Sequence, residues 1–212
     1  TQSPSSAASD VYKRQKSFMA YLALACGVPV YGLDYRLSPE HTYPAALIDA
    51  VSAFVELSQT FAPERIMCVG DSAGGGLALA SLLRLKENGL ALAGAAALLS
   101  AWLDGTASGE SYGIRRAEFC AGMRSYAGDY PLDAVGLSPL FGDHVGLPPL
   151  LLQVVNSEPM RDDSTQLQQL ASSAGVDSRI EIFEYGFHDF QIFTDIPLSL
   201  IHISEPTRPF HI

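Results

Sequence analysis

The chain has 212 residues, of which 48% are hydrophobic, so it can bury a full core and we expect one main domain. Its formal net charge of −10 argues against binding to nucleic acid and against stable association with anionic membranes. Three widely spaced cysteines in apolar segments, Cys26, Cys68 and Cys120, favour core residues over disulfides or metal ligands. Because neither a membrane-spanning apolar run nor a signal-peptide layout occurs, a soluble cytoplasmic protein is the default expectation.

The two ends of the chain differ from the part between them. Residues 1–15 and 198–212 have no usable apolar period, and within them residues 11–15 and 201–208 resemble translated sequencing adapter. We therefore expect two disordered tails of non-native appearance around a domain at residues 16–197. His202 and His211 receive no role.

Between these tails, apolar segments of strand and helix character take turns. In chain order we predict a helix at 18–25 stopped by Gly27, a buried strand at 28–33, a helix at 44–57, a strand at 66–69, a helix ending before Gly89, a strand at 93–99, short helices and loops at 105–137, a strand at 149–155, a helix at 163–174 and a strand at 179–185. This alternation predicts an α/β fold, in which helices cover both faces of a mostly parallel sheet. Active groups are then expected at the carboxyl ends of the strands.

The stretch Gly70-Asp71-Ser72-Ala73-Gly74 lies between the strand at 66–69 and the helix that follows it. A strand, a tight glycine-flanked turn and a helix form a nucleophile elbow, in which a strained turn exposes the serine above the sheet. Ser72 is the predicted nucleophile, and the N–H of Ala73 is expected to face the oxyanion. The plainer alternative is a serine in an ordinary glycine-rich loop.

A serine nucleophile needs a base and an acid, which follow it in the order acid, then histidine in this fold. His188 comes directly after the last predicted strand, where a loop can place its imidazole over the elbow. His41 and His144 precede the acid candidates and fit the order badly. His188 is therefore the predicted base, against the alternative of an ordinary surface or core histidine.

The acid is expected just after the strand at 149–155, where Glu158, Asp162 and Asp163 follow. Glu158 is the first carboxylate after the strand and is the predicted acid. Asp162 and Asp163 are explained without catalysis if they cap the next helix, since acidic residues favour a helix N-terminus.

Several motifs together resemble the bacterial hormone-sensitive-lipase family of α/β-hydrolase esterases, over residues 17–193. They are Asp34-Tyr35-Arg36-Leu37-Ser38-Pro39-Glu40, Tyr43-Pro44-Ala45-Ala46, Gly70-Asp71-Ser72-Ala73-Gly74-Gly75, Ser100-Ala101-Trp102-Leu103-Asp104, Ser138-Pro139-Leu140 and Leu147-Pro148-Pro149. The resemblance implies that Ser72 is the nucleophile, Glu158 the acid and His188 the base. It also implies hydrolysis of small-molecule esters with short to medium acyl groups, through an acyl-enzyme and without a cofactor.

The chain departs from the family pattern in two ways. Glu158, Ala101 and Asp189 stand where aspartate, proline and glycine are more usual. The His-Gly-Gly-Gly oxyanion loop, expected upstream of the Tyr35-Arg36 motif, is absent, as are the first strands. The expectation is an amino-terminally truncated α/β-hydrolase domain of impaired activity, in which residues 105–137 form a partial cap.

Two other functions fit the same residues. The same elbow serves amidases and peptidases of this fold. Some relatives have abandoned catalysis and bind ligands, although these typically lose a member of the triad, and all three members are present here. The last predicted strand, at a sheet edge, also gives an expectation of edge pairing into a homodimer.

Overall fold

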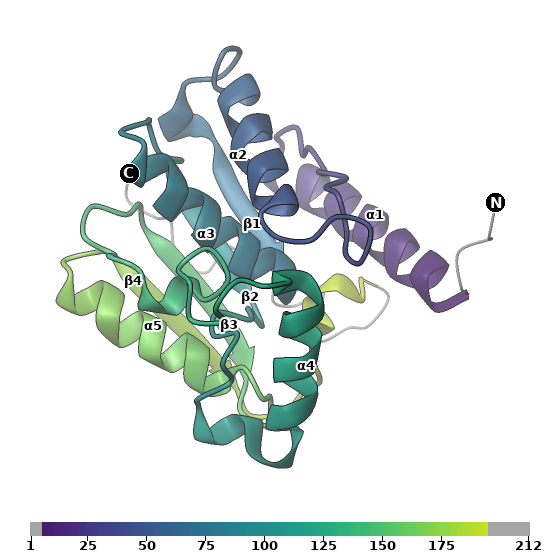
Figure 1. Ribbon diagram of the computed structural model, residues 1–212. Coiled ribbons are helices and arrows are strands. Elements are labelled where there is room, and N and C mark those ends of the chain that lie inside the picture. The colour runs from purple at the N-terminus through teal and green to yellow at the C-terminus, as the bar shows by residue number, and fades with distance from the viewer. Residues whose placement is uncertain (1–5, 195–212) are drawn as a thin grey trace. The chain divides into compact units, whose positions relative to one another are not determined.

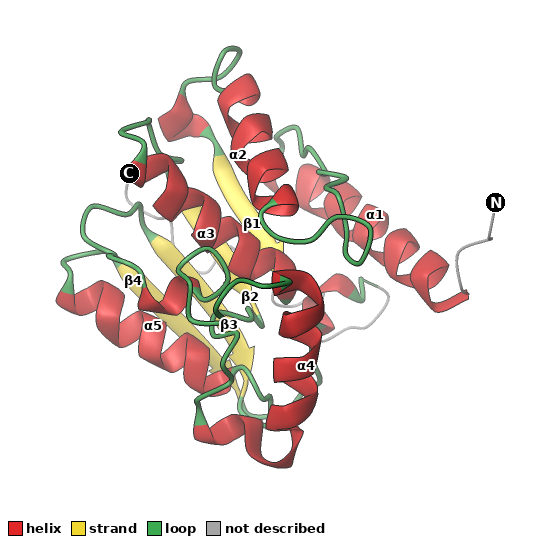
Figure 2. Ribbon diagram, viewed as in Figure 1, coloured by secondary structure: helices red, strands yellow, loops and turns green. Residues whose placement is uncertain are grey.

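The computed structural model describes residues 6–194, in which helices and strands alternate (Figure 1 and Figure 2). The elements are α1 (Ser6–Cys26), α2 (Ala45–Leu57), η1 (Pro63–Arg65), β1 (Met67–Asp71), α3 (Ala73–Glu87), β2 (Ala95–Leu99), η2 (Glu110–Arg115), α4 (Arg116–Ala127), η3 (Pro139–Phe141), β3 (Leu150–Val155), α5 (Arg161–Ser173), β4 (Ser178–Phe183) and η4 (Phe190–Ile192), where η marks a 3-10 helix. The chain divides into two compact units. Tyr35–His188 forms the first, and, of the described residues, 6–34 and 189–194 belong to the second.

The first unit is built on a parallel sheet with strand order β1-β2-β3-β4. The predicted α/β architecture is therefore confirmed. Because the strands follow one another in a single direction and parallel crossovers are right-handed, α3 and α5 lie on the same face of the sheet (Figure 1). Within Tyr35–His188 the described helices that contact the sheet cover this one face, where the sequence predicts helices on both.

The core of this unit fills the space between that face and the helices. It unites apolar side chains of α2, α3, α5, β2 and β3, with β1 and β4 at its margin, and includes Phe54, Leu79, Leu82, Leu98, Leu150, Leu152 and Leu167. A second cluster joins α2 and α3 to α4 through Leu47, Ala80 and Met123. These two clusters fix β1, β2 and β3 against α3, so the ends of the strands and the start of α3 have defined positions.

The opposite face of the sheet is more polar and, at β1, more exposed. Met67 and Val69 of β1 are 49% and 42% exposed. On β3 this face carries Gln153, whose amide donates to Glu181 of β4 at 2.8 Å. Alternation along parallel strands explains why Cys68, between Met67 and Val69, packs instead against the core.

The predicted strand at 28–33 is wrong. This segment is irregular, and its apolar side chains Val28, Tyr31 and Leu33 are exposed. A strand is stable only when a neighbouring strand takes up its backbone hydrogen bonds, and none of the described strands pairs with this segment.

The expected disorder before residue 16 also differs from the structure, in which α1 begins at Ser6. Alanine, lysine, arginine and glutamine are good helix formers, and they are frequent in residues 6–16, so the helix predicted at 18–25 extends backwards. The other expected tail, 198–212, lies outside the described residues.

Candidate active site

Ser72 lies in the turn between β1 and α3. Its backbone has φ 51° and ψ −118°, a region that residues other than glycine rarely adopt. The Ser72 N–H donates to the Leu99 carbonyl at 2.9 Å, and the Ser72 carbonyl accepts from the Trp102 N–H at 2.9 Å. The strained strand-to-helix turn predicted from the sequence is present, and the chain that leaves β2 holds it on both sides.

Close backbone contacts explain the glycines of this turn. A Cβ at Gly70 would collide with the backbone of Gly74 and Gly75, and a Cβ at Gly76 would collide with the Trp102 carbonyl. A Cβ at Gly74 would meet only Asp71 Oδ1, at 3.8 Å, which is ordinary contact. Of the two glycines that flank the turn, Gly70 is therefore required for space and Gly74 is not.

His188 joins Ser72 to Glu158. Its Nε2 lies 2.9 Å from Ser72 Oγ, and its Nδ1 lies 3.0 Å from Glu158 Oε2. The carboxylate can only accept, so His188 Nδ1–H donates to it, and Nε2 is then free to accept the Ser72 hydroxyl proton. The structure thus brings together, from three separate loops, the three side chains that the sequence predicts as nucleophile, acid and base.

Glu158 is the most enclosed of the three, since it is only 3% exposed. Its Oε1 accepts hydrogen bonds from Ser100 Oγ at 2.8 Å and from the Val155 N–H at 3.1 Å, which leaves Oε2 to face His188. A carboxylate that accepts several hydrogen bonds is held in one orientation.

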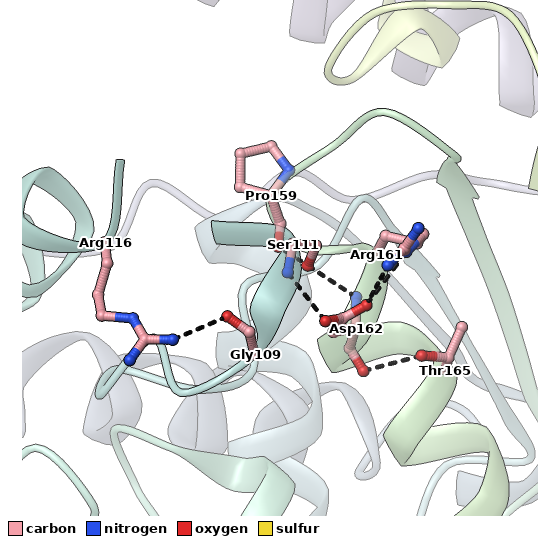
Figure 3. Close-up of polar contacts among 7 residues, drawn as sticks. All are labelled: Gly109, Ser111, Arg116, Pro159, Arg161, Asp162 and Thr165. Atoms are coloured by element: carbon pink, nitrogen blue, oxygen red, sulfur yellow. Dashed lines mark hydrogen bonds and ion pairs between the residues drawn. The ribbon is translucent and has the colours of Figure 1, made fainter. Parts of the chain in front are cut away.

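Asp162 contacts other residues (Figure 3). Its Oδ2 accepts from the Ser111 N–H at 2.9 Å and its Oδ1 from the Arg161 guanidinium at 2.8 Å, while the Asp162 N–H donates to Ser111 Oγ. Burial opposes ionisation, but the hydrogen bonds from Arg161 and Ser111 prevail and lower the pKa of Asp162. Asp162 therefore fastens the segment at 109–111 to α5, and Gly109 lies close against its Cβ.

Asp163 is buried beside a different part of the same segment. Its Oδ2 accepts from the N–H groups of Leu103 and Asp104, both at 3.0 Å, and from the Tyr112 hydroxyl at 2.7 Å. Burial, with a smaller contribution from the charge of Asp104, raises the pKa of Asp163 to about 7 despite these bonds. Both residues lie in the first turn of α5, as the sequence predicts, but the expected side-chain cap is wrong, because α5 has no such cap and both carboxylates bind residues 103–112 instead.

The other histidine and cysteine candidates lie elsewhere. His144 is buried with its Nε2 3.2 Å from the Pro139 carbonyl, and burial lowers its pKa. Cys26 is exposed, so its expected core position is wrong, whereas Cys68 and Cys120 are partly buried. Among residues 6–194, no group of three His, Cys, Asp or Glu side chains is arranged to hold a metal ion.

Ala73, the predicted oxyanion donor, is the first residue of α3. Its N–H has no acceptor within the helix, because the first N–H groups of any helix lack one. The positive end of the helix dipole adds to the attraction of this position for a negative oxygen.

None of the helices among residues 6–194 has the length and apolar character that a membrane span requires.

Ser100 is a residue of this site to which the sequence assigned no role. It belongs to the motif Ser100-Ala101-Trp102-Leu103-Asp104 quoted for the family resemblance, and that was its only signal. Its contact with Glu158 joins residues 58 positions apart, which no local pattern reports.

The chain matches the family model described as the alpha/beta hydrolase fold over residues 7–192. Among curated proteins it is 39% identical to an acetyl-hydrolase of Streptomyces hygroscopicus over 174 residues, which cover 77% of this chain and 58% of that protein. It is 35% identical over 190 residues to an esterase of Acinetobacter venetianus, covering 84% of this chain and 62% of that protein. The chain thus spans about three fifths of the length of these two relatives.

Solved structures give the same result. The crystal structure of an esterase from the bacterial hormone-sensitive lipase family matches with a TM-score of 0.86 and 36% identity, covering 90% of this chain and 67% of that one. A structure of EstE5 soaked with p-nitrophenyl butyrate matches with a TM-score of 0.86 and 33% identity, with the same coverages. The chain belongs to the α/β-hydrolase fold family, and within it to the bacterial hormone-sensitive-lipase group of esterases.

Proposed function

We propose that the chain hydrolyses carboxylic esters with short to medium acyl groups, with Ser72 as nucleophile, His188 as general base and Glu158 as the acid that orients it. The observation that carries the proposal is the continuous pair of contacts from Ser72 Oγ to His188 Nε2 and from His188 Nδ1 to Glu158 Oε2, at 2.9 and 3.0 Å. Esterase relatives and the strained turn at Ser72 support it.

The first half of the reaction forms an acyl-enzyme. Ser72 Oγ attacks the ester carbonyl carbon while its proton passes to His188 Nε2, and the Ala73 N–H donates to the developing oxyanion. The tetrahedral intermediate then expels the alcohol, which takes the proton from His188 Nε2. Throughout, Glu158 accepts the hydrogen bond from Nδ1–H and stabilises the imidazolium by its charge.

The second half repeats these steps with water. His188 removes a proton from a water molecule, the resulting hydroxide attacks the acyl carbon bound to Ser72, and the acid is released as Ser72 regains its proton. The side chains of Ser72, His188 and Glu158, the Ala73 N–H and water carry out this sequence. The partner implied is a small ester, and a cytoplasmic location remains an expectation from the sequence.

We expect the activity of this chain by itself to be weak. The sequence contains no His-Gly-Gly-Gly loop, so Ala73 is the one oxyanion donor that we assign. Removal of a single donor typically lowers kcat by about 10² to 10³, and the assay must therefore be sensitive enough to follow slow, Ser72-dependent turnover.

The test is turnover of p-nitrophenyl butyrate by the chain and by its Ser72→Ala variant. Loss of the nucleophile in a comparable triad costs roughly a million-fold in kcat, so Ser72→Ala should lose nearly all of the wild-type turnover. The matched control is Ser172→Ala, which removes an exposed hydroxyl on α5 and should leave turnover unchanged. Equal turnover by wild type and Ser72→Ala would remove Ser72 from the mechanism.

An aryl amide with the same acyl group separates the ester hydrolase from an amidase. We expect Ser72-dependent release from the ester and far slower release from the amide. Faster release from the amide would favour the amidase or peptidase. Binding of the ester without Ser72-dependent release from either compound would favour the ligand-binding alternative.

A further inference from the structure

We infer that Ser100 is a positioning residue for the reaction, because its hydroxyl fixes the Glu158 carboxylate in the orientation that His188 requires. The inference rests on the proposed function, since it assigns a role to Ser100 only through Glu158 and His188. The Ser100 hydroxyl donates to Glu158 Oε1 at 2.8 Å, so it acts on the acid and not directly on Ser72 or His188.

This hydrogen bond decides which carboxylate oxygen meets the imidazole. Glu158 Oε1 is held by Ser100 Oγ and by the Val155 N–H, so Oε2 projects towards His188 Nδ1 at 3.0 Å. A glutamate has one more rotatable bond than the aspartate more usual at this position, and each free rotation spreads the carboxylate over more positions. Because two donors hold Oε1, the Glu158 carboxylate loses this rotational freedom.

The backbone at Ser100 connects the acid to the nucleophile. The Ser100 N–H donates to the Gln153 carbonyl of β3 at 2.7 Å, while the neighbouring residues Leu99 and Trp102 bind the N–H and the carbonyl of Ser72. One short segment at the end of β2 therefore holds the turn of the nucleophile through its backbone and the acid through a side chain. A shift of this segment would change both distances to His188 together.

Ser100 is also strained in a way that local structure does not explain. Its φ is +46° and it is fully buried, at 0% exposure. Residues other than glycine keep such a backbone only where the surroundings enforce it, and these positions cluster at functional sites. Glycine would fit this backbone more easily, so we take the hydroxyl to be the reason for a serine.

The first experiment compares Ser100→Gly with Ser100→Ala in p-nitrophenyl butyrate turnover. Both variants lose the hydroxyl, but only glycine relieves the backbone. A hydrogen bond to a buried carboxylate is worth enough that both should lower kcat by roughly 10- to 100-fold, with KM changed less than about twofold because Ser100 is fully buried. Near-wild-type kcat in Ser100→Gly would overturn the inference and leave backbone geometry as the explanation.

Ser81→Ala is the matched control. Ser81 is a buried serine whose hydroxyl donates to the Leu77 carbonyl within α3, so its removal deletes a buried hydrogen bond without touching Glu158. Its kcat should equal that of the wild type. A similar loss in Ser81→Ala would mean that any buried hydroxyl has this effect and would also overturn the inference.

A double-mutant cycle separates positioning from a general structural effect. If Ser100 acts through Glu158, then Ser100→Gly should cost nothing further in kcat once Glu158→Gln has been made, so the double variant should match Glu158→Gln alone. Additive losses would show that Ser100 acts elsewhere. If Ser72→Ala retains activity, the proposed function fails, whereas loss in Ser72→Ala with full activity in Ser100→Gly defeats this inference alone.

The proton on His188 Nδ1 gives a readout that needs no turnover. Held by a carboxylate, it should give a slowly exchanging downfield proton resonance in the 212-residue chain. We expect Ser100→Gly to broaden or abolish this resonance, Glu158→Gln to abolish it and Ser81→Ala to leave it unchanged. An unchanged resonance in Ser100→Gly would contradict the inference whatever the activity of the chain.

Discussion

Ser72 and Glu158, the predicted nucleophile and acid, lie at the ends of two strands of one sheet, and the two strands have very different surroundings. Leu150, Leu152 and Val154 of β3 are completely buried, whereas Met67 and Val69 of β1 are 49% and 42% exposed. Glu158, after β3, is held by tertiary hydrogen bonds from residues distant in sequence. Ser72, after β1, lies in a turn that Gly70 permits locally, and its N–H and carbonyl are bound by Leu99 and Trp102.

The difference shows two ways to hold a reactive group. A turn such as that at Ser72 can be specified by a few neighbouring residues, because Gly70 lets the chain approach itself closely. A buried carboxylate cannot be specified locally, because its charge must be satisfied by donors that the rest of the fold brings to it. Changes at the acid end should therefore affect activity and stability more than changes on the exposed strand.

The largest expected effect at the acid end is on activity. Glu158→Gln should lower kcat by roughly ten-thousandfold, as in the serine-protease template, because glutamine no longer stabilises the imidazolium or fixes its tautomer. Asp162→Asn should lower kcat less than about tenfold, since Asp162 binds Ser111 and Arg161 rather than His188. Turnover of an aryl butyrate by the two variants measures this. If Asp162→Asn is the more damaging, Asp162 is the acid and the comparison is reversed.

The next effect is on stability as a function of pH. Asp163 has an ordinary pKa of 3.8 when exposed and a pKa of about 7 in the fold, so between these values the folded chain holds a proton that the unfolded chain has released. The stabilisation from this group is complete below pH 3.8 and is lost as the pH rises towards 7, with a slope of up to about 1.4 kcal/mol per pH unit.

Urea unfolding of the wild type and of Asp163→Asn between pH 5 and 8 tests this, since the other titrating groups cancel in the difference. The free energy of unfolding of the wild type should fall relative to that of Asp163→Asn up to about pH 7 and then run parallel to it. A difference that does not change with pH would mean that Asp163 stays ionised despite its burial and the charge of Asp104.

The smallest expected effect concerns the exposed strand. A lysine on an exposed strand discourages edge-to-edge association, so Val69→Lys should reduce the formation of large aggregates while changing the free energy of unfolding by less than about 0.5 kcal/mol. Ile182→Lys on β4, at a similarly exposed position, is the matched variant. Light scattering against concentration compares them. If the homodimer expected through the last strand forms, Ile182→Lys should weaken it and Val69→Lys should not. Aggregation unchanged by Val69→Lys would mean that β1 is not the associating edge.

The sequence predicted the parts of the molecule that depend on local geometry. The elbow, the parallel sheet and the position of His188 after β4 follow from short patterns and from the order of elements, and the structure has all three. The catalytic roles of Ser72, Glu158 and His188 stay predictions.

What the sequence did not predict depends on contacts between distant residues. The role of Ser100 arises from a hydrogen bond to Glu158 across β2 and β3. The segment 28–33 has the composition of a buried strand, but composition does not show whether another strand lies beside it to pair with. Asp162 and Asp163 have the local features of helix caps, yet residues 103–112 compete for them more strongly than their own helix does.

The backbone angles of Ser72 also limit which nucleophiles evolution or an engineer can place there. At φ 51°, with its N–H and carbonyl both bound, the residue cannot relax to a more common conformation. A β-branched side chain is severely disfavoured at such angles, so threonine is excluded although it carries the same hydroxyl. Cysteine and aspartate have an unbranched Cβ and are both known types of covalent nucleophile. The elbow thus admits a change of reaction chemistry at this position more readily than the addition of one methyl group.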